Sequence, residues 1–214
     1  MTFSRTSALL ILLLAAPAGA QEVEEIKLDG VLGTVDAGAA QKLLATKRHA
    51  FEACFTDNVT ELRYVGGRAT LRFRVKPDGS LRWVQLASGD LGAWPVEKCL
   101  RKAAADLKLA PPKGGEAEFR FPIDLPANAP TSFQQEAIDG KKLAALRACG
   151  KTPGEVTITA YVGPGGQVTS VGFGTDANAV LTEKWGDCAQ AKATAWKLRD
   201  PRGQVVKTQG VWKR

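Results

Sequence analysis

Residues 67–79 read GRATLRFRVKPDG, and residues 154–166 read GEVTITAYVGPGG. In both stretches apolar side chains alternate with more polar ones up to a Pro-x-Gly turn, as expected for a half-buried strand that enters a hairpin. The two stretches align without a gap at an offset of 87 residues. The identical pairs are Gly67/Gly154, Thr70/Thr157, Val75/Val162, Pro77/Pro164, Gly79/Gly166 and, further along, Val84/Val171.

A second block of identities follows at nearly the same offset. Two residues are inserted, and an offset of 89 then holds for Cys99/Cys188, Leu109/Leu198, Pro112/Pro201 and Gly114/Gly203. Cys54 and Cys149 align less well, because the connection in the second copy is shorter. Chance similarity between two strands does not explain the second block. The sequence therefore predicts a duplicated domain of about 90 residues, which is a normal domain size.

Each copy is predicted to contain a helix, a β-hairpin, a second helix and a third strand. The elements of the first copy are expected at 39–55, 69–76, 81–87, 96–107 and 117–125, and those of the second at 143–149, 155–162, 167–175, 181–198 and 205–212. A hairpin followed by a helical crossover places the third strand beside the first, in the order 2-1-3. We therefore expect an α+β fold of two tandem α-β-β-α-β domains, each a three-stranded antiparallel sheet with two helices on one face and one intradomain disulfide.

The beginning of the chain has the pattern of a signal peptide. Arg5 precedes the apolar run Ala8–Ala16, and Ala18-Gly19-Ala20 forms a small-x-small cleavage site. Cleavage between Ala20 and Gln21 predicts a periplasmic or secreted protein, and nothing after residue 20 is apolar for long enough to be a transmembrane segment. The predicted divisions are a signal peptide at 1–20, an N-terminal segment at 21–34, a first domain at 35–126, a linker at 127–133 and a degenerate second domain at 134–214.

Four cysteines are distributed equally between the two copies. Export to an oxidising compartment favours disulfides over a four-thiolate zinc site, and no CxxC motif is present. Of the three possible connectivities, only Cys54–Cys99 with Cys149–Cys188 keeps each bridge inside one copy. The cysteines are therefore predicted to be structural.

The composition offers little for catalysis. The 214 residues include 29 Lys and Arg, 22 Asp and Glu and a single histidine, His49, with a formal net charge of +7. A Ser-His-Asp triad could use only His49, and a histidine-based metal site lacks a second imidazole. No catalytic, cofactor-binding or metal-binding residue is predicted. Nucleic-acid binding is disfavoured, because loss of the signal peptide leaves a charge of +6 and no helix carries a basic stripe.

The order of motifs in the first copy resembles the TonB C-terminal-like superfamily, and within it most closely the myxobacterial AgmX/PglI C-terminal domain family. The matching residues of the first copy are Cys54, Gly67, Asp78, Gly79, Val96, Glu97, Cys99, Pro112, Gly114, Gly115, Phe121 and Pro122. The second copy keeps Cys149, Gly154, Gly166, Cys188, Pro201 and Gly203 but lacks the GG and FP endings. The resemblance implies a bacterial envelope protein that binds other proteins, since TonB captures an extended receptor peptide at a sheet edge. The sequence lacks a retained membrane anchor and the long Pro-rich span of TonB. The resemblance therefore implies binding of a peptide at the sheet edge, and not the transduction of inner-membrane energy.

Two surfaces of the first copy could bind a partner. The strand at 116–125, which includes Phe119 and Phe121, is expected at the edge of its sheet and could accept a partner strand, unless Pro122 and charges merely blunt it or the other copy covers it. The second surface is the sheet face away from the helices, where the alternation places Arg72, Arg74, Lys76, Trp83, Gln85 and Arg120. That face would suit acidic peptides or anionic glycan and lipid headgroups, or it could be a solvated face or the packing surface for the second domain.

Three functions follow, in order of preference. The first is a non-enzymatic exported envelope protein that binds protein or peptide partners by strand addition. The alternative is binding of anionic envelope polymers, peptidoglycan or lipopolysaccharide, through the basic sheet face. The third is an unrecognised hydrolase, for which the sequence contains no supporting arrangement of residues.

Overall fold

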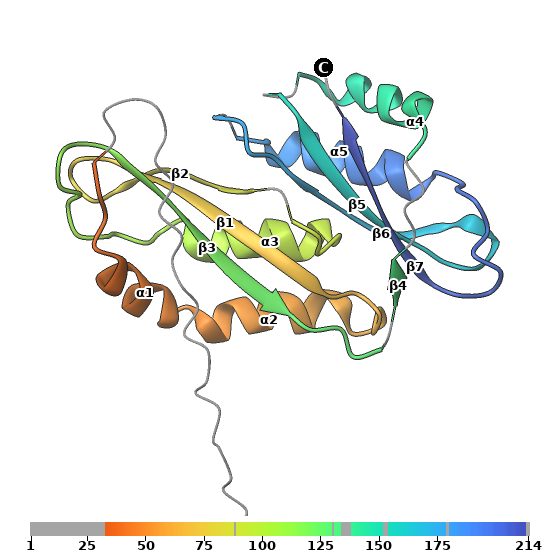
Figure 1. Cartoon of the computed structure of the whole chain (residues 1–214), viewed down its shortest axis with the longest axis horizontal. Helices are drawn as coiled ribbons and strands as arrows, with labels where there is room; N and C mark the ends of the chain where they lie inside the picture. Colours follow the sequence, from red (N-terminus) through yellow and green to blue (C-terminus); the bar gives the residue numbers. More distant parts are fainter. Residues whose placement is uncertain are drawn as a thin grey trace, which may run out of the picture.

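The computed structural model describes residues 33–87, 89–129, 131–133, 138–151, 154–178 and 180–212. The predicted signal peptide, and all of the N-terminal segment except Gly33 and Thr34, lie outside the described residues. The described chain is a mixed α/β structure with two sheets, which lie beside each other with a helix behind each (Figure 1). No described helix has the length and apolar character that a membrane span requires.

The first sheet has the predicted strand order. It consists of β1 (Gly67–Val75), β2 (Leu81–Leu86) and β3 (Ala117–Leu125), in the antiparallel order β2-β1-β3. One face is apolar, because Leu71 and Phe73 of β1 lie beside Phe121 and Phe119 of β3 and all four are buried. The other face carries the polar side chains of both strands.

Three helices accompany the first sheet: α1 (Ala37–Ala45), α2 (Arg48–Val59) and α3 (Trp94–Ala104). The prediction of one helix at 39–55 is wrong, since the helix is broken at Thr46 and Lys47. The Thr46 hydroxyl donates to the Leu43 carbonyl at 2.6 Å, and the side chain of Lys47 reaches Asp106 at 2.9 Å. The Thr46 bond is a local side-chain bond of the kind that competes with helix continuation, and the Lys47 contact anchors the end of the break to a distant part of the chain. The break lets α2 turn its apolar side chains, Phe51 among them, onto the sheet.

The second sheet has four strands where three were predicted. Its order is β4-β7-β5-β6, with β4 at Ser132–Phe133, β5 at Val156–Val162, β6 at Val168–Gly174 and β7 at Val206–Trp212. Three of these strands repeat the order of the first sheet, and β4, which comes from the predicted linker, pairs parallel with β7. The accompanying helices are α4 (Gly140–Ala145), the 3-10 helices η1 (Leu146–Cys149) and η2 (Pro164–Gly166), and α5 (Glu183–Thr194).

Both predicted disulfides are confirmed. Cys54 is bonded to Cys99 and Cys149 to Cys188, across sequence separations of 45 and 39 residues. The first bridge joins α2 to α3, and the second joins η1 to α5. Each bridge therefore ties together two helical segments of the same half.

Gly79 and Gly166 occupy equivalent turns and make the same contact. Their φ angles are 81° and 79°, and each carbonyl accepts a bond from a later backbone amide, that of Leu109 in one half and Leu198 in the other. A Cβ at either glycine would overlap the carbonyl oxygen of that same leucine. The equivalence predicted from the sequence offset therefore extends to backbone conformation and hydrogen bonding.

We expect Gly166→Ala to lower the free energy of unfolding by about 2–3 kcal/mol, because strain at positive φ adds to a backbone overlap. Gly165→Ala is the control, since Gly165 also has a positive φ but faces open space. It should cost about 1–2 kcal/mol, the strain alone. Urea unfolding of both variants measures the difference, and equal costs would contradict a role for the Leu198 carbonyl.

Candidate functional site

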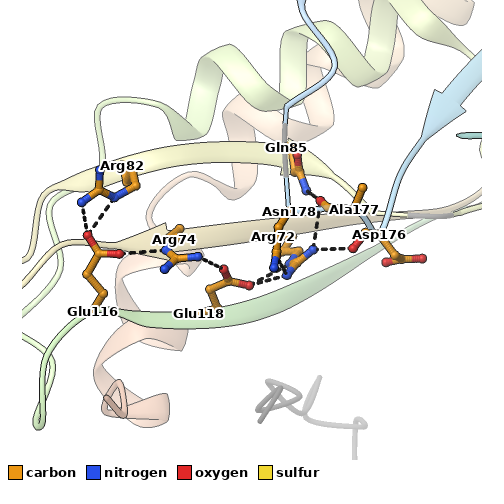
Figure 2. Close-up of polar contacts among 9 residues, drawn as sticks. All are labelled: Arg72, Arg74, Arg82, Gln85, Glu116, Glu118, Asp176, Ala177 and Asn178. Carbon is orange, nitrogen blue, oxygen red and sulfur yellow. Dashed lines mark hydrogen bonds and ion pairs between the residues drawn. The ribbon is translucent and has the colours of Figure 1, made fainter. Parts of the chain in front are cut away.

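The polar face of the first sheet carries a row of ion pairs. Arg72 and Arg74 of β1 lie opposite Arg120 and Glu118 of β3 in the strand register. Arg74 bonds Glu116 at 2.8 Å through Nε and Glu118 at 2.9 Å through Nη1, and Arg82 of β2 also contacts Glu116. Figure 2 shows these side chains in line along the face. The arginines are therefore already neutralised in large part by carboxylates of the same sheet.

Arg72 is the buried centre of this row. It is 1% exposed, and its Nη2 lies 2.5 Å from a carboxylate oxygen of Glu118, which is buried too. Its Nη1 donates to the carbonyl of Asp176 at 2.7 Å, and its Nη2 also donates to the side-chain oxygen of Asn178 at 2.7 Å (Figure 2). Arg72 therefore lies on the predicted face of the sheet, but residues 176–178 of the second half cover it there, as in the alternative of a packing surface between the two halves.

The other predicted residues of this face are partly covered. Trp83 is half-buried with its ring 5.4 Å from the guanidinium carbon of Arg72, and Gln85 is buried and donates to the Ala177 carbonyl. Arg120 pairs with Asp176 at 2.8 Å, and Lys76 is half-buried just beyond the end of β1. Four arginines, Arg72, Arg74, Arg82 and Arg120, thus meet three carboxylates, Glu116, Glu118 and Asp176. Little uncompensated positive charge is left here for an anionic polymer.

Two salt-bridge partners were missed although the sequence contained their signal. Glu118 alternates with Ala117 and Phe119, so the strand pattern already places it on the face of Arg72 and Arg74. The Arg82 guanidinium, and after it that of Arg74, holds the pKa of Glu116 below its ordinary value. Asp176 had no such signal, because its position depends on how the second half packs.

The side chains of Phe119 and Phe121 face the core. They are 2% and 8% exposed; Phe119 stacks on Phe73 at 4.7 Å between ring centroids, and Phe121 lies 6.5 Å from Phe51. The structure therefore gives these two side chains a packing role, and the sequence-based expectation that they contact a partner is not supported by their position. What the strand can present to a partner is its backbone.

The outer edge of β3 is the second candidate surface. Among the described residues β1 is the only strand that pairs with β3, and Pro122 occupies a position typical of an edge strand. The edge is contacted at its beginning, where the Gly33 amide donates to the Glu116 carbonyl at 2.5 Å and Thr34 forms an antiparallel bridge with Lys113. The nine residues of β3 itself lie beyond this contact.

The equivalent polar face of the second sheet is covered by the first half. The Tyr161 hydroxyl donates to the Gly66 carbonyl at 2.6 Å, and the hydroxyls of Thr159 and Ser170 donate to the carbonyls of Gly89 and Gly92. A hollow of about 550 Å³ remains beside this contact, lined by Tyr64, Gly66, Asp90, Ala127, Asn128, Ala129, Thr131 and Lys207. The Lys207 ammonium at its border is held by the Gly66 carbonyl at 2.6 Å and by Asp90 at 3.3 Å.

The described residues contain no group of three or more His, Cys, Asp and Glu side chains that could hold a metal ion. The side chain of His49 is 99% exposed on α2 and lies 3.5 Å from Glu52, which suits an exposed polar residue. Comparisons with protein-family models, with curated proteins and with solved structures find no match to this chain.

Proposed function

We propose that this chain is a non-enzymatic, exported protein of the bacterial envelope that binds an extended segment of a partner protein by strand addition to the outer edge of β3. The observation that carries the proposal is the position of β3 at the end of its sheet, with no strand of the described residues beyond it. An extended segment can pair with such an edge through backbone hydrogen bonds. The motifs that resemble TonB C-terminal domains support the same mode of binding.

Backbone directions identify the groups that a partner would use. The Glu116 carbonyl points to the outer side, because it accepts the Gly33 amide there. Backbone groups alternate in direction along a strand, so those of Glu118 and Arg120 also point outward. Pro122 falls in the same series, where its missing N–H costs no bond to β1. Any partner strand would therefore find backbone donors and acceptors from Glu118 and Arg120, and a gap in the donors at Pro122.

We also propose that the two halves are copies of one domain, with bounds at 35–126 and 134–214. Support comes from register shifts at equivalent positions of the two sheets, as well as from the matching strand order. The pairing of β1 with β2 shifts register between Arg74 and Val75, and the pairing of β5 with β6 shifts register between Tyr161 and Val162, 87 residues later. We assign partner capture to the first copy, because in the second copy β4 already pairs with Val206 and Lys207 at the beginning of the corresponding edge of β7.

Arg120→Pro tests the edge directly. The substitution removes the outward amide of residue 120 while the bonds between β1 and β3 remain, so capture of an extended partner should fall at least tenfold. Arg120→Ala is the matched control, since it loses the same side chain and the contact with Asp176 but retains the amide.

The measurement is capture from an envelope extract by the immobilised mature chain, with bound proteins identified by mass spectrometry. Proteins that bind the wild type and Arg120→Ala but not Arg120→Pro support strand addition. An identical set of proteins on all three chains would exclude the β3 edge, provided that circular dichroism shows all three to be folded.

A further inference from the structure

Glu97 is a buried carboxyl group that crosses from one half of the molecule to the other. It lies in the first turn of α3, is 5% exposed, and accepts the backbone amide of Phe173 in β6 through Oε2 at 2.8 Å. Its Oε1 accepts the amide of Ala93, at the start of its own helix, at 3.3 Å. The side chain therefore connects the N-terminus of α3 with a strand of the second sheet.

The edge of β6 has both a hydrogen-bond donor and space for the Glu97 carboxyl. β6 is the last strand of the second sheet, and the Phe173 amide that meets Glu97 would otherwise be an unpaired edge donor. Gly172 makes room, because a Cβ there would overlap the Glu97 carboxylate. Close by, the Thr175 amide bonds the Leu86 carbonyl at 3.0 Å, and the ring of Trp94 packs edge-on against Phe173.

Among the residues that the structure describes, no cationic side chain compensates the Glu97 carboxyl. On α3, Lys98 pairs with Asp187 of α5, and the Arg101 guanidinium donates to the Leu181 carbonyl. In the loop before α3, Asp90 accepts the Arg68 amide. Arg68 of β1 lines the same small void but pairs with Asp124, and β5 and β6 contribute no charged side chain.

We infer that Glu97 is a proton-operated latch between the two halves: its neutral carboxyl holds the N-terminus of α3 against the edge of β6, and its ionisation loosens this contact. The inference concerns the contact between the halves, and it is independent of partner binding at β3. It requires only that a charge at this site be less favourable in the closed contact than in water.

The pKa of Glu97 supports the latch. Burial raises the pKa of Glu97 to about 7 from the ordinary 4.5, against the lowering effect of backbone bonds from Phe173, Ala93 and Gly92. In the open state the solvated carboxyl ionises near its ordinary value, so the contact is strongest below pH 4.5 and weakens as the pH rises to about 7. The corresponding change in the opening equilibrium is about 300-fold.

Hydrogen exchange of the full mature chain measures this opening. Protection factors of the amides in β6 and the first turn of α3 should fall by up to about 150-fold between pH 4.5 and pH 8 in the wild type, because the open-state carboxyl is already half ionised at pH 4.5. Glu97→Gln should show protection that hardly changes with pH. Glu61→Gln, which alters an exposed carboxylate of the same half, should behave as the wild type.

A wild type whose protection factors do not change with pH would overturn the latch, as would an unchanged pH dependence in Glu97→Gln. A second measurement does not depend on a variant: the side-chain carboxyl carbon of Glu97 should titrate by NMR with a midpoint near 7, together with the Phe173 amide. A midpoint at or below 4.5 would equally overturn the proposal.

Discussion

Glu118→Leu is expected to lower the free energy of unfolding by about 3–5 kcal/mol, because it leaves the buried Arg72 guanidinium without its carboxylate. Arg72→Met should cost a similar amount, since Glu118 then keeps only Arg74 as an ionic partner. The backbone acceptors from residues 176–178 remain for Arg72, but a carbonyl does not neutralise a full charge.

The double variant Arg72→Met with Glu118→Leu separates charge from packing. Two apolar side chains of similar volume remove both buried charges, so the double variant should cost less than either single substitution. Urea unfolding of the three variants gives the cycle, and a double variant whose cost equals the sum of the singles would contradict a coupled pair. Arg68→Gln is the control, because Arg68 also donates two hydrogen bonds to one carboxylate, that of Asp124, but at an exposed position where little stability is expected from the pair.

The fold was largely predictable because its signals are local. Alternation at residues 69–75 predicts β1, and Pro77-Asp78-Gly79 predicts the turn of the hairpin. The sequence offset between the two halves predicts the same strand and turn in the second half, and it also predicts the disulfide pairing. The helix break at Thr46 and the pairing of β4 were not predictable in this way. The first depends on a side-chain hydrogen bond, and the second on a two-residue segment too short to show a period.

The candidate site was predicted less well, for a reason that Arg72 illustrates. Alternation shows on which face of a strand a side chain lies, but not what covers that face. The cover of Arg72 comes from Asp176–Asn178, more than a hundred residues further along the chain. Glu97 is a similar case, since its motif position was visible while its acceptor role toward Phe173 depends on how the two halves pack.

Removal of either disulfide should lower the free energy of unfolding by about 4 kcal/mol, because the closed loops of 45 and 39 residues differ little in chain entropy. The paired substitutions are Cys54→Ala with Cys99→Ala, and Cys149→Ala with Cys188→Ala. Guanidinium unfolding measures the global effect, with the reduced wild type as the reference for loss of both bridges. A loss below about 1 kcal/mol in both variants would contradict the loop-entropy argument.

The local consequences of the two removals should differ, because the bridges join helices of unequal length. α2 has 12 residues and buries Phe51, Cys54, Phe55 and Val59, so packing can hold it without the bond to α3. α4 has six residues and η1 four, which is too short for either to persist alone in water. Loss of Cys149–Cys188 should therefore remove hydrogen-exchange protection from residues 140–149 while the second sheet remains protected. Loss of Cys54–Cys99 should leave α2 protected from hydrogen exchange. If both variants lose helix protection equally, the two bridges have the same role despite the difference in helix length.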